Sequence, residues 1–392
     1  MKSLLLILSN LRYFAPSWVF SSLNILIGTW VLYLPHIKMK FDLNDSQIGF
    51  ALFFTALGLL ISIPFVPYVN KKIGTGRSTK YGIIVFALLF NLPLITPSYT
   101  LLCVSLLAIG VFSGFTDVSM NALVSNIEKK DKQNFMSAAH GFFSLGGFIG
   151  AGVGSVLIVV FANPMYHMLL VSSLVILSNL ILARYYENNE ESIQDPPTEK
   201  TNIIKNIRPI LGLSIVAFII MFNEGAVEHW SNLFLFDTVH VSESQAGLGF
   251  VVFSLTMTVG RFFGDGISSK MGAIKTISYG CIIAVFAYAL ILTSNFYSSI
   301  LGFGILGLGL SVIIPEIFRL AGQTKGIHTS VAISVVSGIG FIGFLIGPVL
   351  LGLISSWSSL LMSYVFLLVL VLLAYFLVLF WIQRKYKTEK IN

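Results

Sequence analysis

The hydrophobic residues of the chain occur in long runs separated by short polar stretches. A helix needs about 20 apolar residues to cross the hydrocarbon core of a bilayer. Twelve runs approach or exceed this length, at residues 13–34, 46–69, 79–96, 99–125, 135–161, 164–185, 209–236, 244–268, 272–294, 297–321, 328–355 and 358–382. The pattern therefore predicts an all-α integral membrane protein with twelve transmembrane helices.

One polar stretch, between the sixth and seventh runs, is much longer than the others. It contains the pair Pro196-Pro197 and a cluster of acidic residues, a composition typical of a solvated linker. We therefore expect two six-helix halves, residues 1–186 and 208–392, joined by a cytoplasmic linker at 187–207.

The two halves repeat each other in sequence. A shift of 198 residues aligns the second segment with the eighth, so that Lys72 meets Lys270 and Gly74 meets Gly272. A shift of 193 residues aligns GFIGAGVGSVL in the fifth segment with GFIGFLIGPVL in the eleventh, with seven of eleven positions identical. A displacement by six helices preserves the direction of each helix, which predicts parallel repeats related by an axis along the membrane normal.

The composition agrees with a lipid environment. Of the 392 residues, 56% are hydrophobic and only 10% are charged, and the mean hydropathy is +0.88. Soluble proteins carry roughly 25% charged residues, so the composition excludes cytosolic enzymes and nucleic-acid binders. The two cysteines, Cys103 and Cys281, lie within apolar runs without metal-ligand spacing, and we expect no metal and no cofactor.

The basic residues predict the orientation, because Lys and Arg are enriched in cytoplasmic loops. With the N-terminus inside, only Lys38 and Lys40 lie on the outer face. The inner connections and the C-terminal tail hold Lys71, Lys72, Arg77, Lys80, Lys129, Lys130, Lys132, Lys200, Lys205, Arg208, Lys270, Lys275, Lys325, Arg384, Lys385, Lys387 and Lys390. Both termini are therefore expected in the cytoplasm.

Two parallel six-helix halves joined by a polar linker resemble the major facilitator superfamily over essentially the whole chain. Four strings, DVSMNA, HGFFSLGG, EGAVEHWS and GRFFGD, are similar to the YbjJ-like branch of bacterial inner-membrane carriers, a neighbour of the fucose permease group. The resemblance implies a monomeric carrier of small molecules in the bacterial inner (plasma) membrane.

The chain departs from two motifs of that superfamily. The loop after the second helix usually reads G-x-x-x-D-R-x-G-R, but Lys71 replaces its acid, and Ser269 stands at the equivalent place in the second half. Ser155 occupies the proline position of the Gly-Pro pair that many drug/proton antiporters carry in the fifth helix. The second departure argues against drug efflux.

Ionisable residues inside a membrane are costly and mark functional sites. Helical rise places Asp117, His140, Arg261, Asp265, Glu316 and Arg319 in the cytoplasmic half of the membrane. It places Glu224, Glu228 and His229 at mid-membrane or farther out. The sequence thus predicts an inner charged layer and an outer acidic cluster.

Glu224 and Glu228 are spaced i and i+4, on one face of the seventh helix. Two nearby carboxylates in a medium of low dielectric constant oppose each other's ionisation, which suits a proton carrier. Glu224 is the leading candidate for proton coupling. For Glu228 and His229, a solvated place in the outer headgroup region is the alternative.

Asp117 and Asn121 share one face of the fourth helix, and His140 enters from the fifth at a similar depth. A carboxylate beside an imidazole acts as a proton relay or forms a buried structural pair. Asp117 and His140 are thus further coupling candidates, and the relay, the structural pair and simple exposure at the membrane interface all stay open.

Three other charged residues carry alternatives. Arg261 and Asp265 are spaced as an ion pair within the eighth helix, or serve as gate residues at its inner end. Glu316 follows Pro315, which removes a helical hydrogen bond and predicts a kink in the tenth segment. Glu316 is therefore a coupling candidate that faces a cavity, unless Arg319 neutralises it.

Polar and aromatic side chains supply candidates for the substrate cavity, namely Asn24, Trp30, Asn121, Asn223 and Trp230. Aromatic faces with amides suit a sugar or a nucleoside, whereas tryptophans in the interfacial belt are the alternative. The glycines at 146, 150, 154, 343 and 347 have the spacing that permits close helix packing.

The sequence indicates a secondary transporter of a small polar organic solute, driven by protons and working by alternating access. No GxxxxGK[ST] string occurs, so ATP is not the direct energy source. The alternatives are a proton-driven efflux antiporter for amphiphilic compounds and, remotely, a membrane-embedded sensor or enzyme.

Overall fold

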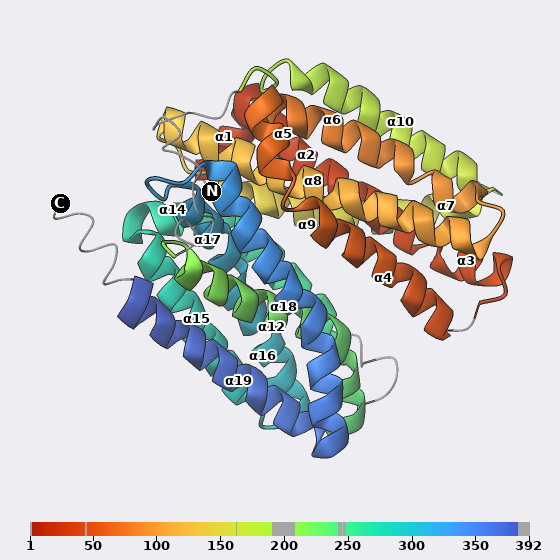
Figure 1. The fold of residues 1–392 in the computed structure, drawn as a ribbon. Coiled ribbons are helices and arrows are strands. Elements are labelled where there is room, and N and C mark those ends of the chain that lie inside the picture. Colours follow the sequence, from red (N-terminus) through yellow and green to blue (C-terminus); the bar gives the residue numbers. More distant parts are fainter. Residues whose placement is uncertain are drawn as a thin grey trace. The chain divides into compact units, whose positions relative to one another are not determined.

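A computed structural model describes residues 2–43, 45–161, 163–189, 208–241, 245 and 248–382. The regular structure within these residues is helical, and each of the twelve predicted segments contains helix (Figure 1). Nine of the described helices are long and apolar enough to cross a membrane, or ten if the bent pair Phe50–Ser62 and Val66–Ile73 forms one span. The prediction of an all-helical membrane protein is confirmed.

The chain divides into two compact units. The N-terminal unit contains Lys2–Gln194 and His328–Ser334, and the C-terminal unit contains Asp195–Ile327 and Val335–Asn392. Most of the predicted linker at 187–207 lies outside the described residues.

The helices of the N-terminal unit follow the first six predicted segments. They are α1 (Lys2–Ser9), α2 (Leu11–Val31), α3 (Leu34–Lys40), α4 (Asp45–Ser62), α5 (Val66–Ile73), α6 (Thr75–Leu89), α7 (Leu92–Ile95), α8 (Tyr99–Asp131), α9 (Met136–Val160) and α10 (Pro164–Ala183). Within this unit α2 packs closely on α9, and α4 and α6 pack on α8.

The C-terminal unit follows the last six segments. It contains α12 (Leu211–Leu233), the π-helix η1 (Phe234–Thr238), α14 (Leu248–Met271), α15 (Ala273–Ile291), α16 (Phe296–Ser311), α17 (Ile313–Gly322), α19 (Leu360–Leu377) and the π-helix η2 (Val378–Ile382). The helix α18 (Thr329–Trp357) begins in residues that cluster with the N-terminal unit and continues into the C-terminal unit. Both α14 and α15 pack closely on α16.

The sequence repeat reappears in the backbone and the packing. Gly74 and Gly272, which the shift of 198 aligns, have φ of +88° and +84° and precede α6 and α15. Residues with a Cβ atom rarely adopt a positive φ, whereas glycine does so readily, which explains why glycine stands at both loops. A Cβ on Gly150 would lie 2.3 Å from the carbonyl oxygen of Ile25, and one on Gly343 equally far from that of Phe218. The shift of 193 residues aligns Gly150 with Gly343 and Ile25 with Phe218, so the same contact occurs in both halves.

The glycine contacts confirm the predicted close packing. A Cβ on Gly146 would lie 2.1 Å from the Ser21 carbonyl oxygen, and one on Gly347 would lie 2.6 Å from that of Phe222. No side chain fits at such distances, so glycine brings α9 against α2 and α18 against α12. Within the membrane, where helices gain little from the hydrophobic effect, this close approach stabilises their association.

Proline breaks the tenth segment as predicted. The helix α16 ends at Ser311, and α17 begins at Ile313 with Pro315 in its first turn. Because proline lacks an N–H group, it is tolerated in the first turn of a new helix. Glu316 and Arg319 therefore lie together on the short helix α17.

The chain departs from the family pattern at the end of α5, where the neutral side chain of Asn70 makes the buried contacts. Asn70, next to Lys71, is buried; its Nδ2 donates to Ser330 Oγ at 3.0 Å, and its Oδ1 accepts from Ser119 Oγ at 3.0 Å. Lys129 Nζ donates to Thr329 Oγ1 at 2.7 Å. The five residues that form these hydrogen bonds belong to the N-terminal unit.

Candidate functional site

The carboxylate of Glu224 lies near the middle of α12. It is 13 residues from Leu211, which corresponds to about 20 Å of helix. Its side chain is 16% exposed, and Oε1 is buried without a hydrogen-bond partner in the described part of the chain. A buried carboxylate oxygen without a partner is costly in the ionised state.

Arg261 on α14 is the basic residue near this carboxylate. Its Nη2 lies 4.0 Å from Glu224 Oε2, and the Arg261 side chain is 12% exposed. A distance of 4.0 Å permits electrostatic attraction but is longer than a hydrogen bond. The pair is therefore close enough to respond to protonation of Glu224 and loose enough to separate.

This pair joins a residue of the predicted inner layer to one that the sequence places at mid-membrane or farther out. Arg261 was expected in the inner layer and Glu224 farther out, yet the structure brings them to one place. Helical rise gives the depth of a Cα atom only, whereas the long arginine side chain reaches a different level. The i, i+4 spacing also favoured a pair between Arg261 and Asp265, and it did not indicate Glu224 as a neighbour.

The other candidates on α12 differ in exposure. Glu228 and His229 are exposed, and His229 Nδ1 lies 2.7 Å from the Gly225 carbonyl oxygen. Asn223 is fully buried: its Nδ2 donates to the Ile219 carbonyl at 2.8 Å, and its Oδ1 accepts from Tyr288 Oη at 2.7 Å. Both polar groups of the Asn223 amide thus have partners inside the C-terminal unit. The side chain of Trp230 is partly exposed.

In the N-terminal unit, Asn121 connects Asp117 to His140. Its Nδ2 donates to the carbonyl oxygen of Asp117 at 2.9 Å and to Asp117 Oδ1 at 3.3 Å. His140 Nε2 lies 3.0 Å from Asn121 Oδ1. Because the two donations orient the amide, its oxygen faces the imidazole, and His140 Nε2 carries the hydrogen of this bond.

These hydrogen bonds use Asp117 Oδ1 but not the second carboxylate oxygen, Oδ2. Asp117 Oδ2 is buried without a hydrogen-bond partner among the described residues. The sequence placed Asp117 beside His140, but the structure interposes the amide of Asn121, which orients both groups. Oδ2 is the atom of Asp117 that is available to a proton.

The candidates on α2 lie within the packed N-terminal unit. Asn24 Nδ2 donates to the Phe143 carbonyl oxygen at 2.9 Å. Trp30 is buried, with its ring centre 6.4 Å from that of Phe90. The Asn24 side chain is half-buried, so it has accessible surface, whereas Trp30 has very little.

A second charged cluster lies deeper in the C-terminal unit. The guanidinium of Arg319 on α17 pairs with Asp265 on α14 and with Glu316 one turn before it. Ser268 Oγ donates to Glu316 Oε2 at 2.7 Å. All four side chains are buried. Arg319 therefore compensates Glu316, as the sequence suggested, and it also binds Asp265.

Ser268 is a member of this cluster that the sequence did not reveal, because a serine on an apolar helix carries no signal of its charged neighbour on α17. In the described residues, no group of three or more His, Cys, Asp or Glu side chains is placed to hold a metal ion.

The fold and the buried charges define a polytopic membrane protein of the transporter class. The model of the Major Facilitator Superfamily matches residues 17–238 and 213–392. The chain belongs to this superfamily, whose members are membrane-embedded transporters of small molecules and not enzymes.

Two curated bacterial proteins are similar to the chain over most of its length. The chain is 29% identical over 335 residues to an uncharacterised MFS-type transporter of Yersinia pestis, covering 85% of this chain and 86% of the relative. It is 28% identical over 346 residues to the membrane protein MosC of Rhizobium meliloti, covering 85% and 81%.

Among solved structures, the transporter FucP matches with a TM-score of 0.75 at 16% identity, over 94% of this chain and 99% of FucP. The human organic anion transporter MFSD10 (TETRAN) matches with a TM-score of 0.72 at 15% identity, over 94% and 98%. Both likenesses show the fold.

Proposed function

We propose that the chain is a proton-coupled secondary transporter that moves a small polar organic solute, such as a sugar or nucleoside, by alternating access. The observation that carries this proposal is the carboxylate of Glu224, buried in α12 with one oxygen unpartnered and the other 4.0 Å from Arg261. A carboxylate in such a place is able to bind and release a proton during a transport cycle.

The pair provides two states of different charge. When Glu224 is ionised, Arg261 attracts it and offsets part of its desolvation cost. When Glu224 is protonated, that attraction is lost. Protonation thus changes the contact between α12 and α14, which is the kind of local change that a carrier converts into movement of helices.

The Asp117, Asn121 and His140 chain is a second site in the proposal. Asp117 Oδ2 is the proton acceptor, and Asn121 keeps the carboxylate and the imidazole in fixed orientations. We assign His140 to positioning and solute binding, because an amide between two groups does not pass a proton readily. Asn24 and Trp230, both with accessible surface, are the proposed solute contacts outside these sites.

The proposed carrier also has a proposed oligomeric state, membrane and orientation. The carrier works as a monomer in a bacterial inner membrane with both termini in the cytoplasm. The distribution of Lys and Arg supports this orientation, and the bacterial relatives support the membrane.

The test uses purified full-length chain in two steps. A thermal-shift screen against sugars, nucleosides, amino acids and peptides identifies a ligand, because only a compound that binds the folded state raises its melting temperature. Proteoliposomes loaded with a pH-sensitive dye then report proton flux during uptake of that ligand. We expect an imposed proton gradient to drive accumulation. Accumulation that follows a sodium gradient and ignores the proton gradient would contradict the proposal.

A further inference from the structure

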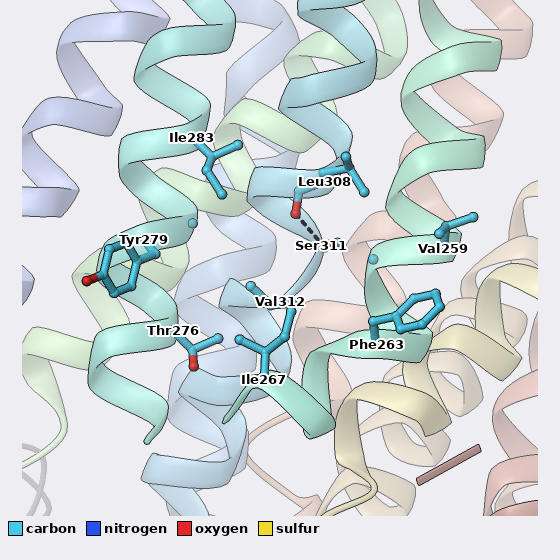
Figure 2. A pocket seen from close by; sticks show the side chains of 11 residues that line it. Val259, Phe263, Ile267, Thr276, Tyr279, Ile283, Leu308, Ser311 and Val312 are labelled. Carbon is cyan, nitrogen blue, oxygen red and sulfur yellow. Dashed lines mark hydrogen bonds between the residues drawn. The ribbon is translucent and has the colours of Figure 1, made fainter. Parts of the chain in front are cut away.

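An apolar groove lies on the C-terminal unit, and neither Glu224 nor Arg261 lines it. Its volume is about 330 Å³, at the lower end of the range of about 300–1,000 Å³ for small-molecule pockets. Figure 2 shows Tyr279 and Ile283 of α15 on one side, Val259 and Phe263 of α14 on the other, and Leu308 of α16 between them.

The groove forms because glycines bring α14 and α15 against α16. A Cβ on Gly260 would lie 2.2 Å from Ser311 Oγ, and one on Gly280 would lie 2.6 Å from the Gly309 carbonyl oxygen. Leu308 of α16 and Val312, which directly follows this helix, form the floor between α14 and α15. The floor coincides with the break between α16 and α17.

The groove is mainly apolar, and two of its three hydroxyl groups already donate to backbone carbonyl oxygens. Its hydroxyl groups are those of Thr276, Tyr279 and Ser311. Thr276 Oγ1 donates to the Gly272 carbonyl oxygen at 3.0 Å, and Ser311 Oγ donates to that of Leu308 at 2.6 Å. The tyrosine is exposed. The remaining lining is hydrocarbon, so the groove favours an alkyl chain over a polar solute.

Two lysines mark one end of the groove. Lys275, Tyr279 and Ile283 are spaced i, i+4 and i+8, so Lys275 extends the α15 wall toward the loop at Gly272. Lys270 lies one turn beyond Ile267 on the opposite wall. Both lysines are exposed. A basic pair at the end of an apolar groove between membrane helices matches the shape of an anionic phospholipid.

We propose that this groove is a specific site for an anionic phospholipid, with an acyl chain along the floor at Leu308 and the phosphate against Lys270 and Lys275. The bound chain covers the break between α16 and α17, at Val312. The site is independent of the transported solute.

Native mass spectrometry of purified full-length chain with phosphatidylglycerol or phosphatidylcholine tests the site. We expect the wild type to bind phosphatidylglycerol about thirtyfold more tightly, because each of the two lysines near a membrane surface contributes on the order of 1 kcal/mol to the binding of an anionic lipid. In the double variant Lys270→Gln/Lys275→Gln the two lipids should bind equally. The matched control is Lys71→Gln/Lys72→Gln, at the repeat-related loop, which should keep the preference.

A second pair of variants tests the acyl chain. Leu308→Trp fills the floor of the groove and should weaken both lipids, whereas Leu301→Trp, on the same helix and 57% exposed outside the groove, should not. Phosphatidylglycerol with a photoreactive acyl chain should crosslink to peptides of α14, α15 and α16 in the wild type. An unchanged preference in the lysine variant, equal binding by the two tryptophan variants, or crosslinks confined to other helices would overturn the proposal.

Discussion

Arg261 on α14 approaches Glu224 on α12 to 4.0 Å between Nη2 and Oε2. The two residues come from helices that are separated in the chain by η1 and the polar connection after it. Neither side chain is more than 16% exposed. The ionisation of one buried group therefore changes the electrostatic environment of the other, so substitution at either position tests the coupling.

Glu224→Gln keeps the shape of the protonated side chain but binds no proton. We expect this variant to lose proton-driven accumulation of the solute, down to background, and to retain solute exchange, which needs no net proton movement. Uptake and counterflow in proteoliposomes measure the two activities. Glu228→Gln is the matched control, because Glu228 lies one turn away on the same helix and is exposed. If Glu224→Gln accumulates solute normally, Glu224 has no part in coupling; if it loses exchange as well, Glu224 binds the solute.

Asn121→Leu removes the amide that connects Asp117 to His140. We expect a lower free energy of unfolding, by about 1–3 kcal/mol, because the carboxylate and the imidazole each lose a hydrogen-bond partner. Asn121→Asp keeps an acceptor for His140 but places a second carboxylate beside Asp117, and it should also destabilise the protein. Denaturant unfolding in detergent measures both. Wild-type stability of the leucine variant would show that the amide is not needed to orient the pair.

Arg319→Leu leaves the carboxylates of Asp265 and Glu316 buried without their shared cation. Removing one partner of a buried ionic cluster costs about 3–5 kcal/mol. We expect a loss of this size, whereas Ser268→Ala, which removes a hydrogen bond to Glu316 and one from Arg319 but leaves the ion pairs, should cost less, about 1.5–3 kcal/mol. Thermal unfolding compares the variants, with the exposed Arg184→Leu as control. Equal effects of Arg319→Leu and Arg184→Leu would contradict this account.

The sequence predicted the helices and the repeat because both depend on local or periodic information. Long apolar runs determine the spans, Pro315 marks the break in the tenth segment, and the aligned Gly74 and Gly272 adopt the same backbone conformation. Such features need no knowledge of how one helix is rotated against the next.

The partners of the charged residues were harder to predict. The i, i+4 rule relates residues on one helix, such as Arg261 and Asp265, and it does not indicate that Glu224 lies near Arg261 or that Arg319 pairs with Asp265. Which side chains meet between helices depends on helix rotation and on close approach at glycines. The neighbouring amide of Asn121 was in the predicted set, but its place between Asp117 and His140 became clear only from the structure.

Gly150→Ala and Gly343→Ala should both destabilise the protein, because their new Cβ atoms would each lie 2.3 Å from a backbone carbonyl oxygen. The helices would have to separate to accept them. Gly152→Ala, on the same helix as Gly150 but with no atom within 4 Å of the new Cβ, is the matched control. It should be neutral or stabilising by up to about 1 kcal/mol, the difference in helix propensity between alanine and glycine. Equal melting temperatures for Gly150→Ala and Gly152→Ala would refute close packing at Gly150.

The orientation of the chain is testable by cysteine labelling in intact cells. Because Cys103 and Cys281 are buried, a new exposed cysteine gives the dominant signal. Asp42→Cys, in the exposed turn after α3, should react with an impermeant maleimide from outside. Lys132→Cys, at the end of α8, and Glu191→Cys, in the predicted linker, should react only after permeabilisation, because the inner connections hold most of the lysines and arginines. Labelling of Glu191→Cys in intact cells would reverse the orientation and place both termini outside.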